Sequence, residues 1–264
     1  MTSATLVQFL RAVLLLGSAL TVFKLYSTGL YRRYPYFFLY FIFRIPNSIW
    51  PFFLKSSDYL YEQIWIVTSP MVLVFYILIT LELYRLVLEN YKGLYSAGRW
   101  ALYLSLTISV AISALSLLPK IKPGMPQRSK VMFYSIGLER GVDTSLAIFI
   151  ILMLCFLSLF PVKLSRNVRV MALVYSVFFL SNTSVLLLRT LFGLRMIEQV
   201  NTLLMALSAA SIIAWLVLLN RAGEVPQASP ARIDARFEDR LLNHLDALNS
   251  ALLRSTSKKG LSPG

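Results

Sequence analysis

Cysteine, histidine and charged residues are all scarce in this sequence. Only 14% of the 264 residues are Asp, Glu, Lys or Arg, against roughly 25% in soluble domains. The one cysteine, Cys155, excludes an intrachain disulfide and a thiolate metal cluster. The one histidine, His244, lies in the hydrophilic C-terminal tail. No His-rich metal site is therefore expected, and no cofactor is predicted.

Apolar residues take the place of the missing charge. They make up 57% of the chain, above the roughly 45–50% of soluble globular domains. A soluble chain of this length could not cover so much apolar side chain with so little polar surface, and the same composition excludes disorder. The sequence therefore predicts an all-α, polytopic membrane helix bundle.

Acidic residues are the scarcer charge, since 12 Asp and Glu stand against 26 Lys and Arg, a formal net charge of +14. In a soluble protein this excess would suggest a nucleic-acid partner. Here the basic residues lie mostly in short segments between apolar runs, where they set topology and contact anionic lipid headgroups. We therefore expect the lipid bilayer, and no nucleic acid, as a partner.

Seven apolar stretches approach the roughly 20 residues that a helix needs to cross a bilayer. They are Thr5–Phe23, Tyr36–Leu54, Ile64–Leu88, Trp100–Leu118, Asp143–Phe160, Val170–Leu191 and Val200–Leu219. The second is the weakest, because Arg44, Pro46 and Pro51 interrupt it. The longest connection, Pro119–Val142, contains several prolines and is predicted to be an extended external loop.

The distribution of Lys and Arg orients the predicted bundle. These residues are more numerous in the connections that share a side with the C-terminus. This bias predicts an outside N-terminus and a cytoplasmic C-terminus in a bacterial cytoplasmic (inner) membrane. The predicted organisation is a seven-span domain over residues 1–220 and a cytoplasmic tail over residues 221–264.

Charged pairs near membrane depth are the first functional candidates, because burying a charge in lipid is costly. Glu82 and Arg85 lie three residues apart on one helical face and are interpreted as an ion pair that anchors the helix end. The alternative is an interhelical lock that changes partner. Glu139 and Asp143 lie at the start of the fifth stretch, where they are expected to cap a helix. Their alternative role is to bind a proton or cation.

The sixth stretch carries Asn182 at its midpoint, followed by Arg189. Such polar groups hydrogen-bond across helices and can line a small polar cavity. The candidate intramembrane polar cluster thus comprises Glu82, Arg85, Glu139, Asp143, Asn182 and Arg189. The sequence has no nucleophile elbow or phosphate-binding glycine loop, so no catalytic residue is predicted.

The tail is predicted to form an amphipathic helix over about residues 230–254. Its apolar face consists of Phe237, Leu241, Leu245, Leu248 and Leu252. Because basic and acidic residues balance on this segment, we expect the face to dock on a protein partner, or on the protein itself, rather than on anionic lipid.

The overall layout resembles uncharacterised bacterial seven-helix integral membrane proteins. The resemblance includes the tyrosine-rich entry to the second stretch and the Glu-Leu-Tyr-Arg sequence that ends the third, and it implies no activity or site. We expect a non-catalytic sensor or scaffold whose tail contacts a partner. The alternative is a small-solute transporter or channel, which a cavity that reaches Asn182 would favour.

Overall fold

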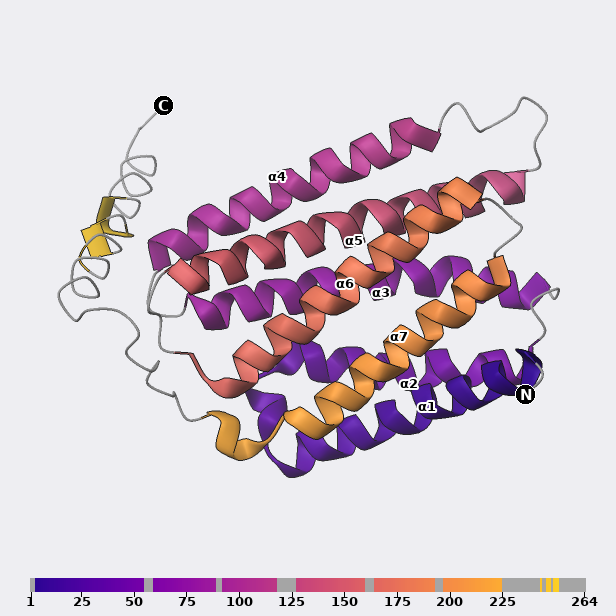
Figure 1. The fold of residues 1–264 in the computed structure, drawn as a ribbon, viewed down its shortest axis with the longest axis horizontal. Helices are drawn as coiled ribbons and strands as arrows, with labels where there is room; N and C mark the ends of the chain where they lie inside the picture. The colour runs from indigo at the N-terminus through magenta and orange to yellow at the C-terminus, as the bar shows by residue number, and fades with distance from the viewer. Residues whose placement is uncertain are drawn as a thin grey trace, which may run out of the picture.

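The computed structural model describes residues 3–54, 59–88, 92–117, 127–159, 164–192 and 197–224, and of the tail residues 243, 246–247 and 249–251. This part of the chain contains no strand and folds into seven long helices and two short 3-10 turns (Figure 1). The helices are α1 (Ser3–Ser27), α2 (Pro35–Phe53), α3 (Tyr59–Val87), α4 (Lys92–Leu117), α5 (Gln127–Leu159), α6 (Arg166–Phe192) and α7 (Ile197–Leu218). The 3-10 turns are η1 (Leu30–Arg32) and η4 (Arg221–Glu224).

Each of the seven predicted apolar stretches corresponds to one helix, in the same order along the chain. Within the described residues, four helices are long and apolar enough to cross a membrane. These segments are Thr5–Ser27, Tyr59–Val87, Arg166–Val185 and Gln199–Leu218. The all-helical prediction is therefore confirmed, and the chain has several helices that fit a membrane protein.

Six of the helices form a closed ring. Going around it, α1 contacts α2, α2 contacts α3, α3 contacts α5, α5 contacts α6, α6 contacts α7, and α7 returns to α1. Helix α4 packs mainly against α5 and lies at the edge of the bundle (Figure 1). The interior of the ring is thus bounded by every long helix except α4.

A cluster of buried aromatic side chains fills one half of the ring. We call it the aromatic cluster, and its members are Phe37, Tyr40, Phe41, Tyr76, Tyr175, Phe178, Phe179 and Trp215. Their rings contact one another across four helices, for example Phe37 with Trp215 at 5.4 Å and Tyr76 with Phe179 at 5.3 Å between centroids. Edge-to-face pairs of this kind add specific stabilisation to the burial of apolar area.

The expected loop at Pro119–Val142 is wrong for its second part, because α5 already begins at Gln127. Residues 127–142 contain charged side chains but no proline, and their two glycines are tolerated inside a long helix. Helix α5 therefore extends well beyond the apolar stretch from which it was predicted. A polar helical extension of this kind leaves no signal in a search for apolar runs.

Helices α4 and α5 approach closely through small residues. The Ser109 hydroxyl donates to the Gly141 carbonyl at 2.8 Å, and the Ser105 and Ser145 hydroxyls lie 3.1 Å apart. Small side chains allow such close contact between helices in an apolar environment. This interface holds α5 in place against α4 and orients the opposite face of α5 towards the interior of the ring.

Candidate functional site

A polar cavity of about 320 Å³ lies inside the six-helix ring. All six ring helices contribute to its wall, which consists of Arg11, Leu14, Arg44, Asn47, Ser48, Pro51, Tyr61, Val72, Tyr76, Glu139, Asn182, Leu204, Met205 and Ser208. The cavity occupies the half of the bundle that carries the start of α1 and the end of α2, and it reaches towards the middle of the ring. Ligand pockets in proteins usually measure about 300–1,000 Å³, so this cavity fits a small solute.

Arg44 places a positive charge on the wall of this cavity. One guanidinium nitrogen donates a hydrogen bond to the Tyr40 hydroxyl, and the guanidinium carbon lies 5.5 Å from the centre of the Tyr40 ring. The buried Nε–H has no hydrogen-bond partner among the described residues. Buried guanidinium groups require an anion or several hydrogen-bond acceptors, and this one has a buried donor without an acceptor among the described residues.

Arg11, on α1, supplies a second positive charge at the cavity wall. Its Nη1 donates a hydrogen bond to the Pro51 carbonyl at 2.8 Å. Pro51 lies in the last turn of α2, where carbonyl groups lack partners within the helix. The contact therefore caps α2 from α1 and fixes the Arg11 side chain at the cavity wall.

Behind the cavity wall, Asn182 of α6, which lines the cavity, is bonded to Asp143 of α5, which does not. Asn182 Nδ2 donates to Asp143 Oδ2 at 3.2 Å, and Asp143 is fully buried. The other carboxylate oxygen of Asp143 and the side-chain oxygen of Asn182 have no hydrogen-bond partner in the described part of the chain. Glu139, one turn before Asp143 on α5, also lines the cavity.

The structure thus brings Glu139, Asp143 and Asn182 together, as three of the six predicted cluster residues. The expected capping role of Glu139 and Asp143 is wrong, because both lie well inside α5, whose first turn contains no acidic residue. The side chain of Arg189 lies outside the described part of the structure. The predicted docking face of the tail, Phe237, Leu241, Leu245, Leu248 and Leu252, lies outside them too, so it stays a prediction.

Glu82 is remote from the cavity and has a different partner from the expected one. Its two carboxylate oxygens accept the backbone N–H groups of Tyr36 at 3.1 Å and Phe37 at 3.2 Å, at the start of α2. Arg85 is exposed, and its positive charge attracts the Glu82 carboxylate, whose hydrogen bonds go to α2. Glu82 therefore joins two helices, because the first N–H groups of α2 lack partners within that helix.

Arg11, Arg44 and Tyr76 are cavity residues that the sequence did not indicate. In the sequence Arg44 interrupts the second apolar stretch, and a charged residue inside such a stretch is itself a signal of function. Tyr76 lies among many aromatic residues and carries no local signal. Only the ring arrangement shows that Tyr76 lies both at the cavity wall and in the aromatic cluster.

No family model matches the sequence, and no curated protein or solved structure is significantly similar to it. Among the described residues, no group of His, Cys, Asp and Glu is arranged to hold a metal ion. The cavity and its charged wall are therefore the basis for a functional proposal.

Proposed function

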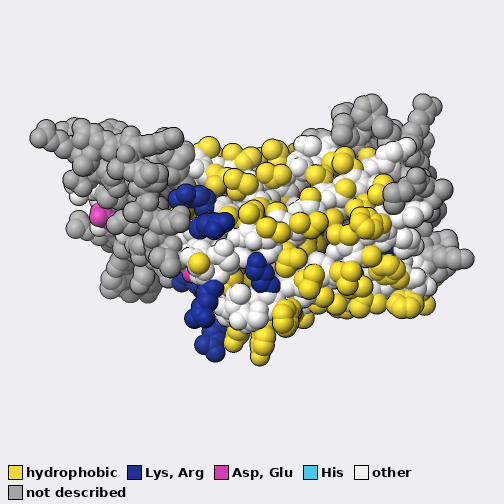
Figure 2. All heavy atoms as spheres, turned by 60° about the horizontal axis from the view of Figure 1, so that its bottom comes forward, with side chains coloured by type: hydrophobic (Ala, Val, Ile, Leu, Met, Phe, Trp, Pro, Cys, Tyr) yellow, Lys and Arg dark blue, Asp and Glu magenta, His cyan; other side chains and the backbone are white. Residues whose placement is uncertain are grey.

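We propose that this protein is a multi-pass protein of the bacterial inner membrane, in which all seven helices cross the bilayer with the N-terminus outside and the C-terminus in the cytoplasm. Four helices have the length and apolarity for this role. The large apolar side chains exposed along the bundle, many of which gather on the face in Figure 2, support the same proposal. The distribution of Lys and Arg supports the orientation.

We further propose that the bundle is a small-solute transporter whose cavity binds a small anion. The observation that carries this proposal is the Arg44 guanidinium, which lines the cavity while its buried Nε–H has no hydrogen-bond partner among the described residues. A buried cation in an apolar bundle is stabilised most by an anionic partner. Arg11 adds a second positive charge to the wall, and the one acidic residue in it, Glu139, leaves the wall with a net positive charge.

The aromatic cluster supports transport over passive conduction. Tyr76 belongs both to the cavity wall and to the cluster, where it contacts Phe178 and Phe179. The packed half of the ring therefore closes the cavity towards the end that carries η1 and η4. An anion bound at Arg44 would cross only after these rings move, as alternating access requires.

The proposal is tested first by binding. Purified protein in detergent is heated with sodium acetate, sodium lactate or sodium phosphate, each compared with sodium chloride at equal ionic strength. A ligand that binds the folded protein raises the unfolding temperature. We expect at least one of the three anions to do so for the unmodified protein, and Arg44→Gln to abolish the shift.

Transport is tested next in proteoliposomes with the anion that gives the largest shift. Uptake should be lost in Arg44→Gln and kept in Arg169→Gln, which removes an exposed arginine outside the cavity. The absence of any anion-dependent shift, or an equal shift in Arg44→Gln, would contradict anion binding. Binding without uptake would favour a sensor, for which the tail remains the predicted output.

A further inference from the structure

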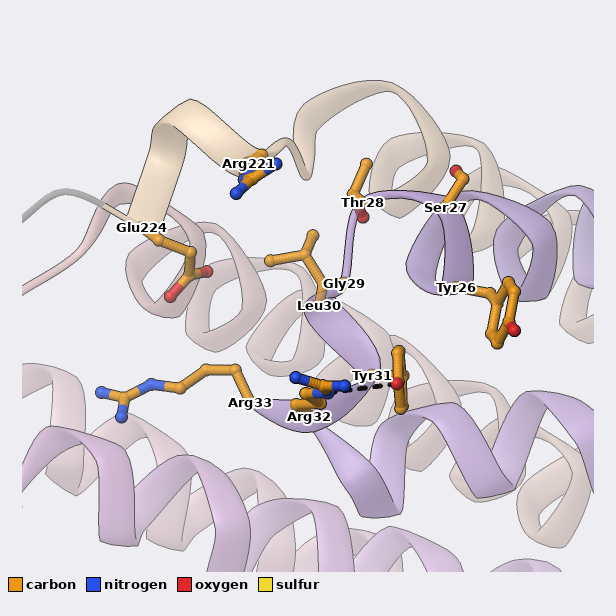
Figure 3. Close-up of a pocket in the computed structure, with 10 residues that line it drawn as sticks. All are labelled: Tyr26, Ser27, Thr28, Gly29, Leu30, Tyr31, Arg32, Arg33, Arg221 and Glu224. Atoms are coloured by element: carbon orange, nitrogen blue, oxygen red, sulfur yellow. Dashed lines mark hydrogen bonds between the residues drawn. The ribbon is translucent and has the colours of Figure 1, made fainter.

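A second hollow of about 690 Å³ lies at the opposite end of the bundle from the cavity. Figure 3 shows the residues around it, which come from the end of α1, from η1 and from η4. They are Tyr26, Ser27, Thr28, Gly29, Leu30, Tyr31, Arg32, Arg33, Arg221 and Glu224. We call this hollow the basic pocket, because three arginines and only one acidic residue line it.

Helix α1 ends in a tight turn that forms one wall of the basic pocket. The Ser27 and Thr28 hydroxyls donate to the Lys24 carbonyl at 3.1 and 2.6 Å. Gly29 then adopts a left-handed conformation with φ of 74° and leads directly into η1. The turn places Arg32 and Arg33 across the hollow from Arg221 (Figure 3).

The opposite wall is held by a buried polar network. Glu224 Oε1 accepts a hydrogen bond from the Tyr34 hydroxyl at 2.7 Å and another from Asn167 Nδ2. Asn167, which is fully buried, also donates to the Asn220 carbonyl at 2.7 Å. The acidic residue of the pocket is thus engaged with neutral donors of the bundle, while Arg32 and Arg221 remain exposed.

An apolar track on α1 leads to the rim of the basic pocket. Its members are large exposed side chains on one helical face, at spacings of three, four and seven residues: Phe9, Leu16, Leu20, Phe23 and Tyr26. Phe23 and Tyr26 are 70% and 65% exposed, and Tyr26 also lines the pocket. In Figure 2, Lys and Arg side chains lie beside the apolar surface towards this same end of the bundle.

We propose that the basic pocket binds the phosphate of an anionic phospholipid, whose acyl chains lie along the apolar track of α1. The arginines match the phosphate in charge and can donate paired hydrogen bonds to its oxygens. The hydroxyl of Tyr31, which accepts from Arg32 Nε at 3.1 Å, orients one guanidinium in the pocket. A charged headgroup site joined to an apolar track fits a lipid better than a free phosphate ion.

This site is independent of the proposed transport function, because it shares no residue with the cavity. It gives part of the chain's positive charge, at Arg32, Arg33 and Arg221, a specific lipid contact in addition to its role in topology. It also places a bound lipid against η4, the segment that links α7 to the tail.

The experiment uses full-length protein, freed of lipid in detergent and titrated with short-chain phosphatidylglycerol, phosphatidylcholine or inorganic phosphate. Binding is measured by native mass spectrometry and by the shift in unfolding temperature. We expect phosphatidylglycerol to bind more tightly than the other two probes. The double variant Arg32→Gln/Arg221→Gln should weaken this binding at least tenfold, since each arginine near a lipid surface contributes roughly a fivefold effect.

Two control variants separate the possible outcomes. Arg169→Gln removes an exposed arginine outside the basic pocket and should leave binding unchanged. Phe23→Ala interrupts the apolar track and should weaken the binding of phosphatidylglycerol but not that of inorganic phosphate. Equal binding of the two phospholipids, or no loss in the double variant, would overturn the site. Inorganic phosphate that binds as tightly as phosphatidylglycerol would overturn the lipid assignment.

Discussion

The Glu82 carboxylate lies 3.1 Å from the backbone nitrogen of Tyr36 and so caps a helix to which it does not belong. Its second oxygen accepts from Phe37, so one side chain of α3 satisfies two of the first N–H groups of α2. Glu82 is only 3% exposed, and water cannot readily replace it. The contact fixes where α2 begins relative to α3.

Replacement of Glu82 should therefore destabilise the bundle. We expect Glu82→Ala to lower the free energy of unfolding by about 1.5–3 kcal/mol, the value for hydrogen bonds to charged groups. Glu82→Gln keeps one acceptor and should lose less. Thermal melts in detergent measure both, with Arg85→Gln as the neighbouring exposed control. A loss in the double variant Glu82→Gln/Arg85→Gln smaller than the sum of the two single losses would show that the two side chains act as a pair.

The bond between Asn182 and Asp143 should contribute to the packing of α5 against α6. We expect Asn182→Ala to lower the free energy of unfolding by about 1–2 kcal/mol, because interhelical hydrogen bonds in membranes reach this range. Ser184→Ala is the matched control on α6, since the Ser184 hydroxyl is exposed and bonds only within its own helix. Equal losses in the two variants would mean that the Asp143 contact carries no stability of its own.

Substitution of either of two glycines near the basic pocket should destabilise the protein, for a different reason at each position. A Cβ on Gly223 would lie 2.3 Å from the Oδ1 atom of Asn167, which is held in the buried network. Gly223→Ala should therefore detach η4, and faster hydrogen exchange at residues 221–224 would show it.

At Gly29 there is space for a Cβ, but φ is 74°. Gly29→Ala should accordingly cost about 1 kcal/mol through backbone strain alone. Gly29→Asn should cost less, because asparagine adopts the left-handed conformation more readily. Alanine and asparagine variants of equal stability would contradict a conformational cause. Thermal melts compare the alanine and asparagine variants. A Cβ at Gly29 meets no neighbouring atom, so packing does not contribute to the difference.

The stability of the protein should fall at alkaline pH in part through Tyr34. Burial raises the pKa of Tyr34, and the hydrogen bond to Glu224 raises it further. The unfolded chain ionises its tyrosines near pH of about 10, while the folded protein keeps the Tyr34 phenol neutral. Stability from this group is therefore present below that pH and is lost as the pH rises above it.

In Tyr34→Phe, the free energy of unfolding should fall less steeply as the pH rises above the tyrosine pKa. Unfolding is measured between neutral and alkaline pH for the unmodified protein, for Tyr34→Phe and for Tyr26→Phe, whose ring is exposed. We expect the dependence of the unfolding free energy on pH, above the tyrosine pKa, to become weaker only in Tyr34→Phe. An identical slope in all three proteins would mean that the Tyr34 hydroxyl ionises as easily in the fold as in the unfolded chain.

Much of the fold could be predicted from the sequence, because seven apolar runs mark seven helices. Helix ends could not, since α5 continues through polar residues that give no apolar signal. The site was predicted in part. Asn182 and Asp143 stood out as polar residues in apolar stretches, but their contact depends on how α5 and α6 pack. Local spacing suggested Arg85 as the partner of Glu82, whereas the hydrogen bonds of Glu82 go to Tyr36 and Phe37, which lie 46 and 45 residues away.

The unequal filling of the ring has a mechanical consequence. In α2, Phe37 and Phe41 are clamped between other rings, whereas Asn47 and Pro51 face the cavity. The first half of this helix thus packs among rings of other helices, whereas the second half borders the cavity and is bound by Arg11 at Pro51, with Pro46 between the two halves. Pro46 removes a backbone hydrogen bond and so weakens the helix at that point. A helix that packs closely on one side of a proline and borders a cavity on the other bends most easily at that proline, and Arg44 lies two residues before it.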